Sequence, residues 1–370
     1  MPTQQLSVLL ATVVDTAGLA RLPMLLSAVG CAVTLLAPKR LAIARSRFVK
    51  RPIADCQSLQ EVVACLRQQI EGEEYAAVIL GDEIVLHEVA KLSDQVWARR
   101  CLPVDPACLA VTLSKHEFAR MASLRSVPTP KEYLCADLEN AVAAARELQF
   151  PLVLKQASGF SGQGVRRVDD EAQLRAVWLE LGGGSLAVQE FLPGRVGSTD
   201  ILFAQGRPLA WTCNYTVRAW PTDFTSSCVR EWADLPFIEP WLEEIGKLTG
   251  FTGFAGIDWI HEPRSGAFHV IELNPRPTPG LYLGEKVGVN FAEAFVGALA
   301  GRATIVRPHR AARPLAVMFP QAVFWGVDHK DFRTILQALR DVPVRDPWLA
   351  LALLRRVLTH YLPPSLRRKH

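Results

Sequence analysis

The sequence predicts an α/β domain of parallel strands at the amino end, an α+β region after it, and a short helical region at the carboxyl end. Three observations support this fold class. The first hundred residues alternate apolar strand-like runs with amphipathic helical segments. From Ser114 the pattern changes to helices mixed with long β-rich stretches, and the last fifty residues contain two helical segments. A chain of 370 residues has room for two or three such domains.

Composition excludes several classes of protein. Apolar residues make up 49% of the chain, which excludes an intrinsically disordered protein. The net charge of +4 is too small to indicate nucleic-acid binding, and no apolar run approaches the roughly 18 residues of a membrane span. Eight cysteines are scattered without CxxC or zinc-ligand spacing. We therefore expect reduced thiols and a cytoplasmic protein that binds no nucleic acid.

The amino-terminal part, residues 1–110, is expected to be a Rossmann-like domain. Its strands are predicted at Leu6–Val14, Cys31–Ala37 and Tyr75–Leu80, with helices at Thr16–Val29 and Ser58–Glu71 between them. Glycines follow both helices, as is typical of helix ends. We read the apolar start as a strand and not as a signal peptide, because no basic residues precede it. No GxGxxG follows the first strand, so a dinucleotide site is not expected there.

The remaining elements divide into a region at 111–310, with a smaller subdomain at about 120–190, and a helical extension at 311–370. Ser114 and Glu117 have the spacing of a capping box at a helix start. Residues 201–274 are expected to be mainly β-structure. The other predicted elements are helices at Asp137–Gln149, Glu171–Leu181, Glu239–Thr249, Phe332–Leu339 and Trp348–Tyr361, and strands at Phe150–Lys155, Val165–Val168 and Leu186–Gln189.

A phosphate-binding segment is predicted where Lys155 ends a buried strand. A flexible loop follows whose backbone N–H groups can turn toward an anion, and the lysine adds a positive charge beside it. The loop lacks the order of a Walker A motif, and an ordinary flexible hairpin is the alternative interpretation. The candidate binding residues of this loop are Ser158, Gly159, Ser161, Gly162 and Gly164.

A metal site is predicted from two strand-like segments joined by a turn at Pro263–Gly266. If the hairpin folds about Ser265, Asp258 faces Glu272, and Asn274 shares a face with Glu272. Two adjacent carboxylates repel each other unless a cation lies between them, and oxygen ligands suit Mg²⁺ or Mn²⁺. The alternative is an exposed polar sheet face.

Taken in order, these segments resemble the ATP-grasp ligase superfamily. The resemblance extends over about Pro103 to Arg302 and covers the amino-terminal part by architecture only. The motifs that carry it are Ser114-Lys115-His116-Glu117-Phe118, Val127-Pro128-Thr129-Pro130, Pro151–Lys155 with its loop, Val188–Gly194, and Asp258 with Ile271–Pro277.

The resemblance implies that two α+β subdomains clasp ATP. It implies that Lys115 and Lys155 contact the phosphates and that the Gly159–Gly164 loop covers them. Arg276 would meet the γ-phosphate and the acyl-phosphate that replaces it. The adenine would lie against Gln189, Glu190, Phe191 and Leu192, and the magnesium ions would be held by Asp258, Glu272 and Asn274.

One position departs from the family pattern. Val196 stands where many members have an acidic residue that holds the ribose, so we considered Asp200 as a substitute. Arg218 and Arg230 lie where the family places substrate groups, and either guanidinium could clamp a carboxylate. A solvated loop is the alternative for that stretch.

The function expected from the resemblance is an ATP-dependent carboxylate–amine ligase that forms ADP through an acyl-phosphate. Its partners would be small-molecule carboxylates and amines, and family members are often dimers. The alternatives are a carboxyphosphate-forming enzyme similar to biotin carboxylase and a non-catalytic ATP-binding module. Residues 346–370 combine leucines, Trp348 and a basic end, which suggests either a peripheral membrane contact or a helix packed on its own domain.

Overall fold

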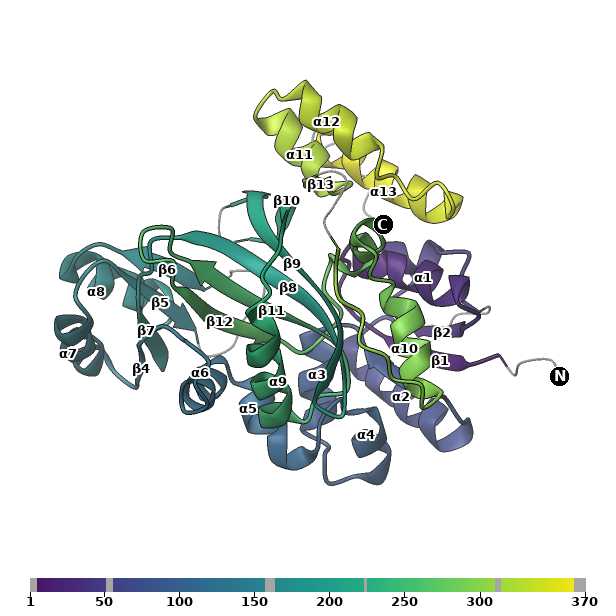
Figure 1. Ribbon diagram of the computed structural model, residues 1–370, viewed down its shortest axis with the longest axis horizontal. Coiled ribbons are helices and arrows are strands. Elements are labelled where there is room, and N and C mark those ends of the chain that lie inside the picture. The colour runs from purple at the N-terminus through teal and green to yellow at the C-terminus, as the bar shows by residue number, and fades with distance from the viewer. Residues whose placement is uncertain (1–4, 51–55, 157–163, 223–224, 310–313, 363–370) are drawn as a thin grey trace.

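The computed structural model describes residues 5–50, 56–156, 164–222, 225–309 and 314–362. Three sheets organise the described residues (Figure 1). The amino-terminal sheet has the order β2-β1-β3, with β1 (Ser7–Ala11) parallel to both β2 (Ala32–Leu36) and β3 (Ala77–Leu80). The parallel α/β start predicted from the sequence is therefore present.

Helices cover both faces of this sheet because its strands are apolar on both sides. Val8 and Leu10 belong to one buried cluster, and the alternating residues Leu9 and Ala11 belong to another. The covering helices are α1 (Leu22–Ala28), α2 (Leu59–Gly72), α3 (Glu83–Ala90) and α4 (Val96–Cys101). The helix predicted at Thr16–Val29 begins later, with a 3₁₀ turn at Leu19–Arg21, and it ends before Gly30 at φ +88°. Neither α3 nor α4 was predicted.

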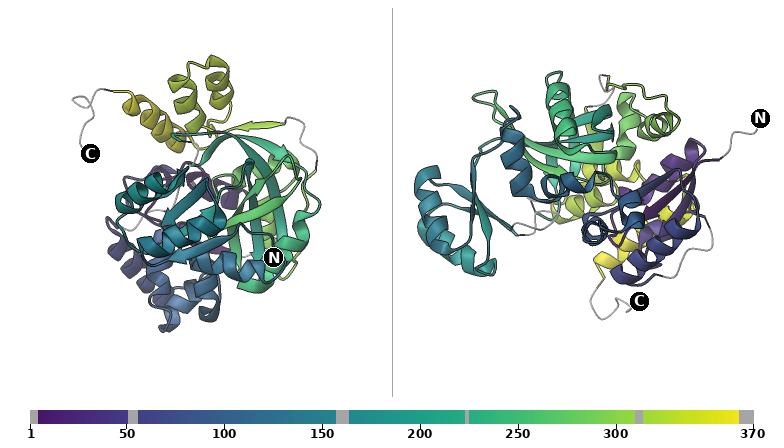
Figure 2. Two further views of the ribbon diagram at one scale, coloured as in Figure 1. Left: turned by 90° about the vertical axis from the view of Figure 1, so that its left-hand side faces the viewer. Right: turned by 90° about the horizontal axis from the view of Figure 1, so that it is seen from below.

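The second sheet, β4-β7-β5-β6, is antiparallel and forms a smaller subdomain that stands apart in Figures 1 and 2. Two short helices, α5 (Leu109–Leu113) and α6 (Lys115–Ser123), precede it. Ser114 caps α6 by accepting a hydrogen bond from the Glu117 backbone N–H at 3.2 Å, as the capping box predicted. The subdomain consists of β4 (Glu132–Cys135), α7 (Leu138–Leu148), β5 (Leu152–Gln156), β6 (Val165–Val168), α8 (Glu171–Glu180) and β7 (Leu186–Glu190).

The third sheet is the largest and has the order β12-β11-β8-β9-β10-β13. One of its faces is apolar and packs against α9 (Ile238–Thr249), with Trp259 fully buried there. The strands are β8 (Arg195–Ala204), β9 (Arg207–Ala219), β10 (Ser227–Ala233), β11 (Gly253–His261), β12 (Phe268–Asn274) and β13 (Leu315–Val317).

Polar side chains share the opposite face of the third sheet, because neighbouring strands are paired in register. Glu272 lies beside Asp258, Asp258 beside Ser198, Ser198 beside Asn214, and Asn214 beside Trp232. This row crosses five strands. The candidate metal ligands thus lie at one end of a row of side chains on a single face.

The carboxyl-terminal region differs from the purely helical extension predicted at 311–370. Its first described element, β13, pairs antiparallel with β10 and extends the large sheet. The helices α11 (Gln321–Asp328), α12 (Phe332–Leu339) and α13 (Pro347–His360) follow, and α10 (Phe291–Leu299) precedes β13. Asp346, at the start of α13, is completely buried and accepts a hydrogen bond from Ser46. The last helix is therefore anchored on the amino-terminal domain.

All eight cysteines lie in the described part of the chain, and no disulfide bond is formed among the described residues. None of the described helices is long and apolar enough to cross a membrane.

Candidate active site

The two predicted metal carboxylates lie on adjacent strands of the large sheet. Asp258 on β11 pairs with Glu272 on β12, which is the pairing predicted from the turn at Ser265. The register shifts just after this pair, between Asp258 and Trp259. Asn274 lies two residues beyond Glu272, and its Nδ2 donates a hydrogen bond to Asp258 Oδ2 at 3.0 Å. The hairpin thus gathers two carboxylates and an amide within one side-chain layer.

Two cationic side chains contact this layer. Lys115 Nζ lies 3.1 Å from Glu272 Oε2, and Arg276 Nη2 donates to Asn274 Oδ1 at 3.0 Å. Lys115 reaches the site from the first turn of α6, and Arg276 follows β12 directly. Both residues were predicted to act on the nucleotide phosphates, and the structure brings both of them to the carboxylates.

A third carboxylate reaches the site from the amino-terminal domain and was not predicted. Glu83, in the first turn of α3, accepts a hydrogen bond from Arg276 Nε at 2.9 Å. Their separation of 193 positions in the sequence explains why no local pattern revealed the pair. Asp82 caps the same helix with a hydrogen bond to the Val85 N–H, which fixes the position of Glu83.

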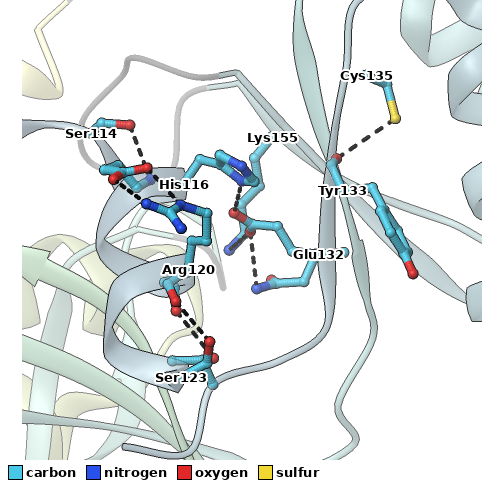
Figure 3. A network of polar contacts seen from close by, with 12 residues as sticks. Ser114, His116, Arg120, Ser123, Glu132, Tyr133, Cys135 and Lys155 are labelled. Carbon is cyan, nitrogen blue, oxygen red and sulfur yellow. Dashed lines mark hydrogen bonds and ion pairs between the residues drawn. The ribbon is translucent and has the colours of Figure 1, made fainter. Parts of the chain in front are cut away.

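Glu132 connects the smaller subdomain to α6 and was also missed (Figure 3). Its carboxylate contacts His116 Nδ1 at 2.9 Å, Gln189 Nε2 at 3.4 Å and Lys155 Nζ at 3.9 Å. The Glu132 side chain is only 6% exposed. His116, which the sequence analysis named only as part of the Ser114–Phe118 motif, lies in this network and shares Glu132 with Lys155.

The electrostatics of the site follow from crowded carboxylates and burial. Burial and the neighbouring negative charge of Glu272 raise the pKa of Asp258 to about 7. Burial also lowers the pKa of Lys155, while Glu132 and Glu272 counteract this effect by favouring the charged amine. Asp258 therefore carries a proton over part of the neutral pH range unless a cation stabilises its charged form.

The donor set fits a hard divalent cation. Asp258, Glu272 and Asn274 offer carboxylate and amide oxygens, which are the ligands Mg²⁺ takes, and the raised pKa of Asp258 reflects charge that a cation would compensate. Within the described ranges, no group of three or more His, Cys, Asp or Glu side chains has metal-binding geometry. Three protein oxygen ligands leave the other coordination positions of Mg²⁺ to water and phosphate oxygens.

The predicted nucleotide segment is partly described. Gln189 is buried at the end of β7, and the Glu190 carboxylate accepts a hydrogen bond from the Lys131 backbone N–H at 2.7 Å. The Phe191 ring lies under the guanidinium of Arg167 at 4.4 Å, and Leu192 is half-buried. Gly164 ends the loop at φ +75°. The predicted residues Ser158, Gly159, Ser161 and Gly162 lie outside the described residues.

Three polar residues considered for binding take part in ion pairs within the protein, and their binding roles stay predictions. Asp200 is 1% exposed, lies 3.2 Å from Arg230 and accepts a hydrogen bond from Thr278, and its role at a ribose stays a prediction. Arg230 is also buried, at 5% exposure, and its guanidinium forms the ion pair with Asp200. Arg218 lies 3.1 Å from Asp331 and stacks over Trp325 in the carboxyl-terminal helices, away from the carboxylates of the hairpin.

Comparison with known proteins agrees with the fold. Residues 113–280, which contain the four-stranded sheet and the Asp258–Asn274 hairpin, match the family model of the ATP-grasp domain. Residues 113–280 therefore form an ATP-grasp domain.

Individual relatives are distant. The mitochondrial acetyl-CoA carboxylase of Saccharomyces cerevisiae is 23% identical over 157 residues, which are 38% of this chain and 7% of that protein. The carboxyl-terminal section of the carbamoyl phosphate synthase large chain of Methanopyrus kandleri is 22% identical over 218 residues, which are 55% of this chain and 40% of that protein. This chain thus spans less than half the length of either curated relative.

Solved structures share the fold over most of the chain. N5-carboxyaminoimidazole synthetase from Staphylococcus aureus, complexed with ADP, aligns with a TM-score of 0.70 at 11% identity, over 89% of this chain and 86% of that one. Biotin carboxylase from Campylobacter jejuni gives 0.66 at 14% identity, over 84% and 73%. L-amino acid ligase from Bacillus licheniformis gives 0.61 at 18% identity, over 81% and 76%.

Proposed function

We propose that this chain is an ATP-dependent carboxylate–amine ligase that releases ADP and phosphate. The observation that carries the proposal is the pairing of Asp258 with Glu272, with Lys115 at 3.1 Å from the second carboxylate. Acidic residues that face each other and are flanked by lysine and arginine suit a site where a cation and a polyphosphate meet. The ATP-grasp domain and the amino acid ligase fold support the same class of reaction.

The proposed reaction has two steps. A substrate carboxylate oxygen attacks the γ-phosphorus of ATP, and the bond from that phosphorus to the bridging oxygen breaks to release ADP. An amine nitrogen then attacks the acyl carbon, loses a proton to solvent, and the carbon–oxygen bond to phosphate breaks. No protein nucleophile is required, so the residues act by positioning and by charge.

Each cationic residue has a separate task in this proposal. Lys115 and Lys155 balance the phosphate charge from two sides, since one lies on α6 and the other at the end of β5. Arg276, oriented by Glu83 and Asn274, faces the transferred phosphoryl group. Mg²⁺, bound by Asp258, Glu272 and Asn274, would neutralise phosphate charge. Gln189 to Leu192 would contact the adenine at the boundary between the subdomains.

A second candidate function is the activation of bicarbonate to carboxyphosphate. The curated relatives include a carboxylase and a carbamoyl phosphate synthase, and a biotin carboxylase shares the fold. In that reaction bicarbonate takes the place of the substrate carboxylate at the γ-phosphorus. ADP release that requires bicarbonate and no organic carboxylate would favour it.

The test is ADP release from the full chain with Mg²⁺, ATP and amino acids supplied two at a time, with mass spectrometry of products. Lys155→Ala and Glu272→Ala are expected to lower turnover at least about a hundredfold, since charge-stabilising groups carry effects of that size. Lys131→Ala is the matched control, because Lys131 is exposed at the edge of the same subdomain.

Unchanged turnover in both variants would contradict the site assignment. Binding of ATP measured by calorimetry, with no ADP release on any substrate pair or with bicarbonate, would identify a binding module instead of an enzyme.

A further inference from the structure

We propose that the carboxyl-terminal helices dock on an anionic lipid surface. They carry an unusual concentration of exposed apolar side chains, which we call the C-terminal apolar face. Val344 is 78%, Phe332 76% and Leu358 70% exposed, whereas large apolar residues usually gain from burial. The C-terminal apolar face consists of Phe332, Leu336, Leu339, Val344, Trp348, Leu351 and Leu358.

Helical spacing explains how these residues form stripes. On α12, positions 332, 336 and 339 follow one another along one side, and on α13, positions 348, 351 and 358 do the same. The other sides of both helices are already used, since Ala338, Leu349 and Leu353 are buried. Figure 1 shows α12 and α13 at the outer edge of the molecule, away from the four-stranded subdomain.

A shallow apolar depression adjoins the part of this face that α13 contributes. It has a volume of about 500 Å³ and is lined by Val342, Val344, Pro347, Trp348, Leu351 and Leu354. Leucines with a single tryptophan at the edge are typical of helices that lie in the plane of a membrane interface. Because no described helix can cross a membrane, the contact would be with one surface only.

The charges around the face identify the occupant. Lys330, Arg333, Arg340, Arg345 and Arg355 are exposed, and none has a carboxylate partner among the described residues.

Three of the nearby acidic residues are engaged within the protein, whereas Asp328 at the end of α11 is exposed and accepts hydrogen bonds from Trp220 Nε1 and the Tyr361 hydroxyl. Asp331 pairs with Arg218, Asp341 with Arg21, and Asp346 is buried against Ser46. Apolar side chains set among unpaired cations complement a bilayer that contains anionic headgroups.

The same charges disfavour a second copy of the chain as the occupant. A twofold contact through this face would bring the same patch of each copy together and oppose its unpaired cations. An anionic bilayer accommodates both components, because the leucines enter the boundary of the acyl region and the arginines remain at the headgroups.

The test is cosedimentation of the full chain with vesicles of phosphatidylcholine and phosphatidylglycerol, and with phosphatidylcholine alone. We expect binding to the anionic vesicles only, weakened by salt. The double variants Leu351→Ser/Leu358→Ser and Arg345→Glu/Arg355→Glu are each expected to weaken binding about tenfold or more.

Two matched controls are available. Val96→Ser/Leu179→Ser removes equally exposed apolar residues elsewhere, at 73% exposure each, and Arg207→Glu/Arg302→Glu changes exposed charges elsewhere. Both controls should bind like the wild type.

Quenching of tryptophan emission by brominated lipid should fall in Trp348→Phe, which places the contact at α13. Retention of the wild type in the supernatant with both vesicles, or equal binding by all variants, would overturn the proposal. So would a concentration-dependent dimer, seen by ultracentrifugation, that Leu351→Ser/Leu358→Ser abolishes. These outcomes are independent of the ligase reaction, because no residue of the face belongs to the candidate active site.

Discussion

Single residues set the protonation state of the candidate active site, and Asp258 is the clearest case. Its pKa is about 7, chiefly because of burial and secondly because of Glu272. A carboxyl group whose pKa is raised on folding stabilises the protein at low pH, and this contribution is lost as the pH rises through the folded pKa. The native state therefore carries an unfavourable charge at pH 8 when no divalent cation is added.

We predict that Asp258→Asn stabilises the protein at pH 8 in the absence of divalent cations. The expected gain is at most on the order of 4 kcal/mol, since the pKa rises from 3.8 to about 7 and one pKa unit corresponds to about 1.4 kcal/mol, and it should vanish near pH 4. Thermal unfolding across pH measures it. Mg²⁺ should raise the melting temperature of the wild type and not of the variant. A gain that does not depend on pH would contradict this account.

Glu132 acts on the charge of Lys155. Its negative charge favours the protonated amine against the effect of burial, so Glu132→Gln should lower the pKa of Lys155 further. The alkaline limb of kcat/KM should then shift to lower pH, and the KM for ATP should rise about tenfold. Glu147→Gln is the control, because Glu147 is exposed on the same subdomain. A pH profile identical to that of the wild type would refute this role.

At the scale of elements, the segment after β12 positions Arg276 because it packs closely over the large sheet. Gly280 has a φ of −91°, which any residue adopts, so only space requires glycine there. A Cβ at this position would lie 2.1 Å from Arg230 Nη1 and 2.4 Å from Asp200 Oδ2. An added methyl group would therefore displace either the Arg230–Asp200 ion pair or the segment that contains Gly280.

Gly280→Ala is therefore expected to destabilise the protein by about 3 kcal/mol, the usual cost of disrupting a buried ion pair. Urea unfolding measures the change. Gly72→Ala is the control, since a Cβ there meets nothing within 4 Å at the end of a helix, and alanine favours helix. A decrease of less than about 1 kcal/mol in the free energy of unfolding of Gly280→Ala would contradict this prediction, because it would show that the segment moves aside at little cost.

At the scale of the whole molecule, buried polar contacts join the carboxyl-terminal helices to the amino-terminal domain. Asp346 caps α13 through the Leu349 N–H at 3.4 Å and also accepts from the Arg47 N–H at 3.2 Å. Arg47 and Ser46 lie 299 and 300 positions before Asp346 in the sequence. One side chain thus serves both a local and a long-range contact.

We predict that Asp346→Ala costs about 2 kcal/mol and speeds amide hydrogen exchange in α13, because a helix cap and buried hydrogen bonds are lost together. Exchange followed by mass spectrometry locates the effect. Asp105→Ala is the control, since Asp105 caps an exposed 3₁₀ turn. Uniformly faster exchange across the chain, with no excess in α13, would contradict the anchoring role.

Local patterns in the sequence were enough to predict the alternating amino-terminal domain, the Val165–Val168 strand and the hairpin that opposes Asp258 and Glu272. Turn position and strand alternation determine such pairings over short separations, and this register needs no knowledge of the rest of the fold. Lys115 and Arg276 were predicted as phosphate-binding residues because each belongs to one of the motifs that carry the family resemblance. Helices α3 and α11 were missed, as was the joining of β13 to the large sheet.

Only the tertiary structure decided which distant side chains complete the site. Glu83 reaches Arg276, and Glu132 reaches His116 and Lys155, because separate domains pack together there. The same packing enclosed Asp200 with Arg230 and left one side of α12 and α13 uncovered. Sequence spacing determines which face a residue occupies within its own element, whereas the neighbours of that face depend on how all the elements pack.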